Sequence, residues 1–299
     1  AEKWEDDSGA KRFIDEYNGK YTAVTFYGYK GQINVPPINE VFAYVQSDIA
    51  ATNNRDPYIS VNPKTGTVVG AKLWEVALNQ EWRTLKKKEE IEFEIIDKDL
   101  VGFGWHKVGY QVDAKGSLEE GTLEVTDERL YSERVNWRDI VWNIGAKRPP
   151  DDCVWMAQRI VRPLMEVKQK YPNAEKLEGT QHPEVDDKSY QDALYKDDIK
   201  VVVMWEVWDH ETRTIYRLAE GLMDKYLDEP IPWPDFQKEF PFLMYWDFVT
   251  AGQPRPMSAI APWEPQILEK IVILASAVNH VKRWNRQMFI KAGTISGEA

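Results

Sequence analysis

Apolar side chains recur every three or four residues along several segments, which is the spacing of helices with one buried face. The pattern predicts helices over residues 3–18, 38–52, 70–89, 90–103 and 164–170. The helix at 70–89 is expected to bury Leu73, Val76, Ala77, Trp82 and Leu85. The basic run Lys86–Lys88 near its end suits the negative end of the helix dipole, so we expect a solvated helix end there.

Alternating and continuous apolar runs predict strands in other segments. These runs cover residues 58–63, 102–112, 130–135, 153–161, 199–208, 214–219 and 242–248. The run at 199–208 is the strongest, and the turn at 209–213 makes 214–219 its hairpin partner. Residues 173–198 are polar and acidic without a sustained period, which predicts an exposed loop. The proline-rich passage 230–241 is expected to be irregular.

The most regular pattern lies between Trp263 and Met288. Apolar residues there alternate four and three apart, a heptad-like seam along a helix of about seven turns. The seam is formed by Ile267, Ile271, Leu274, Val278 and Val281. The end of this helix is basic, with the side chains of Lys282, Arg283, Arg286 and Lys291.

Composition excludes several classes of protein. The chain has 299 residues and a formal net charge of −11, which argues against a protein that mainly wraps DNA or coats an anionic membrane. The single cysteine, Cys153, excludes an internal disulfide. No uncharged apolar stretch approaches the roughly 20 residues of a bilayer span. The 13 tryptophans and 14 tyrosines fit either an extensive subunit or ligand contact or an aromatic core.

Catalytic constellations are scarce. The histidines lie far apart without metal-ligand spacing, at positions His106, His182, His210 and His280. Asp209-His210-Glu211 falls in a predicted turn, where such residues are common without a metal. Cys153 lies in an apolar run, which indicates an inert buried thiol. Acidic pairs arise readily in a chain with 49 carboxylates. We therefore expect no enzyme activity, no cofactor and no metal.

The order of several passages resembles that of portal proteins, the head-to-tail connectors of tailed bacteriophages. No single passage is specific, but together they cover most of residues 30–291. They are Ile33–Val41, Asn54–Val61, Ala77–Gln80, Val101–Trp105, Glu133–Ile140, Trp155–Arg159, Lys170–Pro172, Val203–Asp209 and Phe240–Phe242.

The resemblance implies an α+β wing over about residues 1–262 and a first stem helix over 263–291. A portal continues beyond that helix into a clip, a second stem helix, a channel loop and a crown, so residues 292–299 are expected to begin a clip-like segment. Portals form twelve-subunit rings around a channel for genomic double-stranded DNA. The implied partners are other copies of the chain, the packaging terminase, head-completion or adaptor proteins and the capsid protein. The implied location is the capsid vertex of the virion, and the host cytoplasm during assembly.

The functional residues are then expected on the stem helix. Lys282, Arg283, Arg286 and Lys291 would contact DNA phosphate or an acidic partner, or would simply favour the helix end. The apolar seam that begins at Ile267 would pack against like helices in the ring.

Two other functions stay open. One is a different phage structural protein, such as a head–tail adaptor or a baseplate component, whose long helix also mediates assembly. The other is a carbohydrate-active hydrolase that uses acidic pairs and stacks sugars on an aromatic-rich surface.

Overall fold

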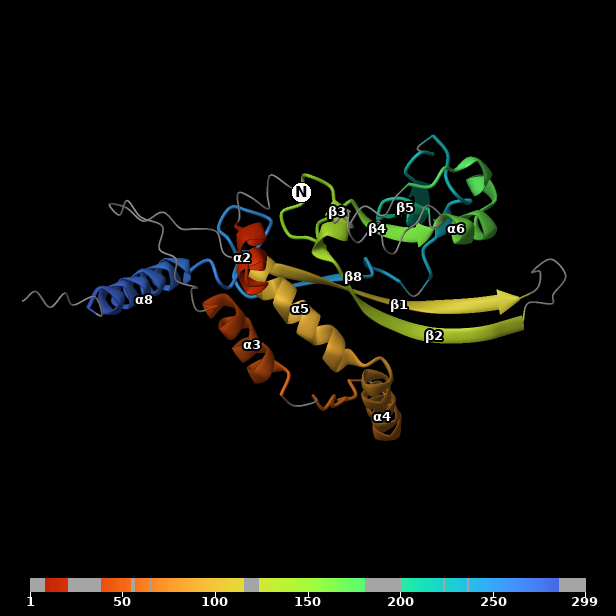
Figure 1. Cartoon of the computed structure of the whole chain (residues 1–299). Helices are drawn as coiled ribbons and strands as arrows, with labels where there is room; N and C mark the ends of the chain where they lie inside the picture. The colour runs from red at the N-terminus through yellow and green to blue at the C-terminus, as the bar shows by residue number, and fades with distance from the viewer. Residues whose placement is uncertain are drawn as a thin grey trace, which may run out of the picture.

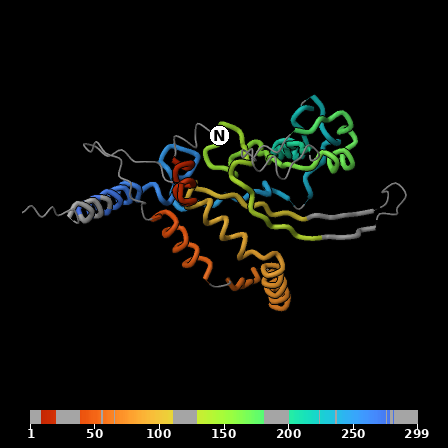
Figure 2. Tube along the Cα trace, in the orientation of Figure 1, coloured from red at the N-terminus to blue at the C-terminus, as the bar shows by residue number. Residues whose placement is uncertain are grey.

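Helices and antiparallel sheets are combined in this protein, and the predicted α+β class is confirmed. The computed structural model describes residues 9–20, 39–54, 57–64, 66–115, 124–180, 200–222, 224–235 and 237–284. Only the backbone is described at residues 111–115, 124–128, 275, 278, 279 and 281–284. Figure 2 follows the path of the chain through these segments.

Four helices come before the first strand: α2 (Ala10–Tyr17), α3 (Glu40–Thr52), α4 (Val68–Thr84) and α5 (Lys87–Val101). The Asn39 side chain caps the start of α3 by accepting a hydrogen bond from the backbone N–H of Phe42. The predicted helices at 70–89 and 90–103 both form, but the break lies earlier than expected. Lys86 adopts a left-handed conformation (φ 48°) and separates α4 from α5. The basic run therefore begins a helix rather than ending one.

The predicted strand at 58–63 is wrong, because this segment lies beside α4 and pairs with no strand among the described residues. The Ile59 N–H donates to Asn79 Oδ1 at 3.1 Å, and Asn79 Nδ2 donates to the Ile59 carbonyl at 2.9 Å. The Val61 N–H donates to Glu75 Oε2 at 3.3 Å. Side chains of a helix thus satisfy the backbone groups that a neighbouring strand would otherwise bind.

The first sheet has three antiparallel strands in the order β2–β1–β8. They are β1 (Phe103–Lys115), β2 (Glu124–Val135) and β8 (Phe242–Trp246). Gly102 ends α5 in a left-handed conformation (φ 105°) and turns the chain into β1. Strands β1 and β2 form a long hairpin that extends away from the helices (Figure 1).

The second sheet has five antiparallel strands in the order β3–β4–β5–β6–β7. They are β3 (Ile140–Trp142), β4 (Trp155–Pro163), β5 (Val201–Asp209), β6 (Thr214–Ala219) and β7 (Ile231–Pro232). A short 3₁₀ helix (Trp137–Asp139) leads into β3. The predicted hairpin of 199–208 with 214–219 is confirmed by the pairing of β5 with β6.

The predicted loop at 173–198 is partly wrong. Helix α6 (Leu164–Lys170) is followed by a second 3₁₀ helix, Pro172–Lys176, which places Ala174 and Leu177 in a buried cluster. Thr180 then pairs with Val201 of β5. The segment 173–198 is so polar that its few buried apolar side chains did not stand out in the sequence. Residues 181–199 lie outside the described part.

One main core joins the two sheets and the N-terminal helices. Trp105 of β1 and Phe242 of β8 lie fully buried in it, together with Met156 of β4 and Phe13 of α2. A smaller core under α6 contains Val167 and its neighbours. Aromatic side chains stack repeatedly within the main core, for example Trp208 against Trp233 with ring centroids 5.3 Å apart. Much of the aromatic content therefore serves packing.

The last described helix, α8 (Glu264–Trp284), leaves the body on the side away from the tip of the β1–β2 hairpin (Figure 1). The preceding chain is fixed to the end of α5, because Ser258 Oγ and the Ala259 N–H both donate to the Asp99 carbonyl. The helix predicted over 263–291 is thus observed for residues 264–284, and 285–299 lie outside the described residues.

Candidate functional site

The predicted apolar seam begins on α8. Ile267, Ile271 and Leu274 are half-buried on this helix, and Ile267 packs against the main core. The remaining predicted residues cannot be placed in a contact: the side chains of Val278, Val281, Lys282 and Arg283 and the whole of Arg286 and Lys291 lie outside the described part. The roles assigned to both groups therefore stay predictions.

The first turns of α8 are tied to the N-terminal helices. Glu264 forms an ion pair with Arg12 of α2, and Lys270 Nζ lies 2.6 Å from Glu40 Oε1 of α3. Ile273, one turn beyond Lys270, is 60% exposed. The first two turns of α8 are therefore fixed to the N-terminal helices, and the apolar side chain of Ile273, just beyond them, is exposed to solvent.

Helix α4 presents a second, larger apolar surface, part of which the sequence predicted to be buried. Leu73, Val76 and Ala77 were expected to be buried, but all three are exposed, Leu73 and Val76 to 68% and 67%. Leu73 and Val76 form a stripe with Val69, and Val68 and Trp74 lie on either side of it. We call these five residues the α4 apolar face. The spacing of apolar residues could not show which side of α4 is buried, because apolar residues occur on both the exposed and the buried side.

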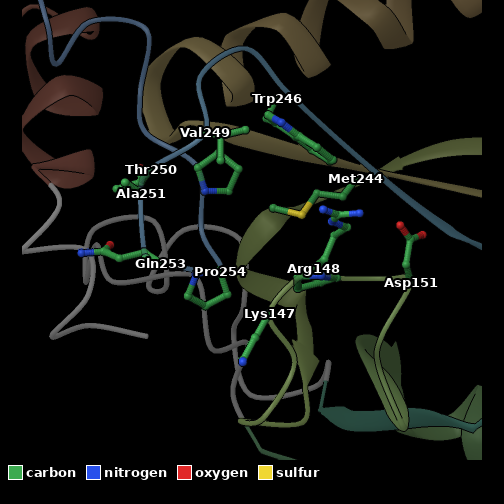
Figure 3. Close-up of a pocket in the computed structure, with 13 residues that line it drawn as sticks. Lys147, Arg148, Asp151, Met244, Trp246, Val249, Thr250, Ala251, Gln253 and Pro254 are labelled. Atoms are coloured by element: carbon green, nitrogen blue, oxygen red, sulfur yellow. The ribbon is translucent and has the colours of Figure 1, made fainter.

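A pocket of about 860 Å³ lies near β8 (Figure 3). Its side chains converge from the loop that contains Lys147 and Arg148, from β8 through Met244 and Trp246, and from the segment 249–256. The Asp152 carboxylate holds the loop by accepting hydrogen bonds from the backbone N–H groups of Lys147 and Arg148, at 2.7 and 2.9 Å. An apolar floor with two cations and the carboxylate of Asp151 at its rim suits an aromatic segment that carries polar groups. No motif in the sequence marked this pocket.

Three carboxylates surround the Lys98 ammonium. Its Nζ atom lies 2.9 Å from Asp48 Oδ2 and 3.2 Å from Asp99 Oδ1, and it also bonds to Asp247. Burial raises the pKa of Asp99 to about 7. Burial opposes the charge on Lys98, but its hydrogen bonds to Asp247 and Asp48 raise the pKa of Lys98 overall.

One oxygen from each of these three carboxylates lies within 4.8 Å of the others, which is close enough to surround a cation. The Lys98 ammonium already lies among them. The arrangement is therefore best described as an ion-pair junction of α3, α5 and the chain after β8.

Two of the described histidines, His106 and His210, pack within the structure. His106 Nε2 lies 2.9 Å from Lys87 Nζ, which also donates to the Ser132 carbonyl, and its Nδ1 contacts Glu94. His210 packs against the rings of Trp233 and Phe240. The solvated helix end expected at Lys86–Lys88 is thus wrong for Lys87, whose ammonium is buried in this network.

Among the described residues, the acidic pairs and the cysteine do not lie together in an arrangement typical of a catalytic site. Asp97 binds Arg134 through two hydrogen bonds of 2.6 and 2.7 Å, whereas its near neighbour Asp99 faces Lys98. Burial raises the pKa of the Cys153 thiol to about 12, as expected for an unreactive thiol.

No known protein family and no curated protein matches the chain. Among the described residues, no helix is both long enough and apolar enough to cross a membrane.

Proposed function

We propose that the protein is a subunit of the portal ring of a tailed bacteriophage, the ring at a capsid vertex through which the genome is packaged and ejected. In this role it acts as a structural component rather than an enzyme and needs no cofactor.

Helix α8 carries the proposal. It leaves an α+β body, pairs such as Lys270–Glu40 tie its first turns to that body, and Ile273, which lies off the predicted seam, is exposed. In the ring, α8 is the first stem helix and its seam from Ile267 onwards packs against the same helix of neighbouring copies.

The order of elements gives further support. Ala77–Gln80 fall on α4, the glycine-marked turn at Gly102 joins α5 to β1, and Trp155–Arg159 and Val203–Asp209 fall on the paired strands β4 and β5. This order of helices and strands is the order that the resemblance to a portal wing leads us to expect, and it supports the proposal.

The charge of the chain fits a DNA channel. A net charge of −11 would let an acidic channel wall repel the phosphate backbone, so that DNA slides without adhering. The basic group Lys282, Arg283, Arg286 and Lys291 is the proposed exception and contacts DNA or an acidic neighbour. The ring would dock the terminase during packaging, then head-completion or adaptor proteins, and would sit within the capsid protein shell.

Native mass spectrometry of the purified protein tests this proposal. We expect a single closed assembly of 34.8 kDa subunits, with twelve as the number that the resemblance to portals implies. A protein that stays monomeric at every concentration would contradict the proposal. An open or helical series of assemblies would instead favour another head–tail or baseplate component.

A further inference from the structure

Ser132, His106 and Glu94 form a hydrogen-bonded chain of side chains that the proposed function does not use. Ser132 Oγ lies 2.6 Å from His106 Nε2, and the other ring nitrogen, Nδ1, contacts the Glu94 carboxylate. A serine, a histidine and a carboxylate bonded in this order are the groups with which many hydrolases activate a serine as a nucleophile. Such a triad is recognised by its geometry and is found on unrelated folds.

Three elements bring these side chains together. His106 lies on β1 and Ser132 on β2, and the register of the hairpin pairs Ser132 with Val108. Directly paired residues share a face of a sheet, and so do residues two positions apart on one strand, which places His106 and Ser132 on the same face. Helix α5 contributes Glu94 from outside the sheet. No local motif connects residues on three elements, so the sequence did not mark this site.

The partners of the His106 imidazole fix which of its nitrogens carries the hydrogen. Nε2 faces both the Ser132 hydroxyl and the Lys87 ammonium, whose Nζ atom lies 2.9 Å away. An ammonium group can only donate, so Nε2 accepts and Nδ1 carries the hydrogen that is donated to Glu94. In this tautomer Nε2 is able to take the proton of the serine hydroxyl.

Burial distinguishes the three members of the chain. The side chains of His106 and Glu94 are 10% and 12% exposed, whereas Ser132 is only half-buried. The hydroxyl is therefore the member that a substrate can approach, and the base behind it is shielded from water. The Lys87 charge contacts the same nitrogen as the hydroxyl, so it lies beside the atoms on which negative charge develops during acyl transfer.

We propose that Ser132 is the nucleophile of a site that hydrolyses small carboxylic esters. Ser132 Oγ attacks the carbonyl carbon of the ester while the hydroxyl proton passes to His106 Nε2. The bond from that carbon to the alcohol oxygen then breaks, and His106 gives the proton to the departing alcohol. Water attacks the acyl-serine in the same way, which releases the carboxylic acid and restores Ser132. Glu94 is a positioning residue, because it holds the imidazole in the required tautomer.

This activity goes beyond the portal proposal and does not depend on it. The residues lie within one copy of the chain, so a monomer would carry the site as well as a ring would. We specify small esters as the substrate class because Ser132 is only partly exposed.

Labelling with a fluorophosphonate, followed by mass spectrometry of the peptides, tests the nucleophile. We expect the label on Ser132, and we expect the same protein to release p-nitrophenol from p-nitrophenyl acetate. Ser132→Ala should abolish both. Ser47→Ala is the matched control and should change neither, because the Ser47 hydroxyl donates to the Ala43 carbonyl instead of to a histidine.

Two further variants test the activation of the serine. His106→Gln should lower the rate of labelling about 100-fold or more, and Glu94→Gln should lower it about tenfold or more. Glu94→Gln should also move the midpoint of the pH–rate profile to lower pH, because the imidazolium loses the carboxylate that stabilises it. A purely structural role of Glu94 would leave that midpoint unchanged. Circular dichroism and thermal melts check that each variant is folded, and Ser132→Ala keeps the test decisive if His106→Gln is not.

A folded wild-type protein that takes no label at Ser132 would overturn the proposal. Ester hydrolysis that persists in Ser132→Ala would overturn it as well, and so would equally fast labelling of Ser132 in folded His106→Gln. None of these results bears on the portal proposal, which is tested by the state of assembly.

Discussion

The Lys107 ammonium of β1 lies 2.8 Å from Glu206 Oε1 of β5 and joins the two sheets through an almost fully buried ion pair. Lys107 also donates to Gln158 Oε1 of β4, at 2.7 Å. Arg217 is the other cation near Glu206, with its Nε atom 3.6 Å from the carboxylate. Lys107 therefore places the nearest positive charge beside Glu206 and donates to acceptors on two strands of the second sheet.

Lys107→Met should lower the free energy of unfolding by about 3 kcal/mol, because it leaves Glu206 buried with weaker compensation. Urea unfolding measures this change. Arg162→Met is the control: its pair with Glu166 is 4.0 Å long and about half exposed, so it should cost less than about 1 kcal/mol. Equal effects of the two variants would contradict the structural role of Lys107.

Stability should also respond to the titration of Asp99. Its pKa of about 7 in the folded protein lies above the 3.8 of a free carboxyl. Between roughly pH 4 and 7 the folded state holds a proton that the unfolded chain has lost, so this group makes the free energy of unfolding fall as pH rises.

Asp99→Asn removes this titration, and Lys98 keeps Asp48 and Asp247 as partners. The stability of the variant relative to wild type should therefore increase with pH across that window, by at most about 1.4 kcal/mol per pH unit. Urea unfolding in steps of about one pH unit gives the slope. A difference independent of pH would show that Asp99 does not titrate there.

Gly102→Ala should loosen the junction between α5 and the chain that leads into α8. An added Cβ would lie 2.6 Å from the Met257 carbonyl carbon and 2.7 Å from Ser258 N. Gly66→Ala is the matched control, since Gly66 also has a positive φ (114°) but nothing within 4 Å of the added carbon. Thermal melts should show a larger loss for Gly102→Ala, by about 2 kcal/mol; equal losses would contradict close packing at Gly102.

The basic end of α8 gives a functional prediction. Replacing Lys282, Arg283, Arg286 and Lys291 by Gln should leave folding intact and reduce the DNA packaged or retained per particle. The control replaces four exposed lysines of the body by Gln: Lys168, Lys176, Lys200 and Lys225. Unchanged packaging in the α8 variant would reject contact with DNA or an acidic partner and leave only a role at the helix end.

Elements with one dominant pattern were predictable from the sequence. Strand β5 is a long apolar run with its first four residues buried, and its hairpin with β6 followed from the turn at 209–213. Helix α3 likewise matched its predicted period, and it runs from Glu40 to Thr52 within the predicted 38–52. Such elements are specified by adjacent residues alone.

Elements that depend on distant side chains were not predictable. The segment around Ile59 alternates like a strand, but Asn79 of α4 binds its backbone instead. The sequence did not predict the exposed apolar side of α4, because the spacing of apolar residues does not show which of them another element covers. The junction at Lys98 joins Asp48 to Asp247, and no local motif connects residues so far apart in the chain.

Electron microscopy of the purified protein, with class averages viewed along the symmetry axis, tests the portal proposal most directly. The proposal predicts closed rings with an axial hole wide enough for a DNA duplex. Compact monomers, or closed particles without an axial hole, would contradict it.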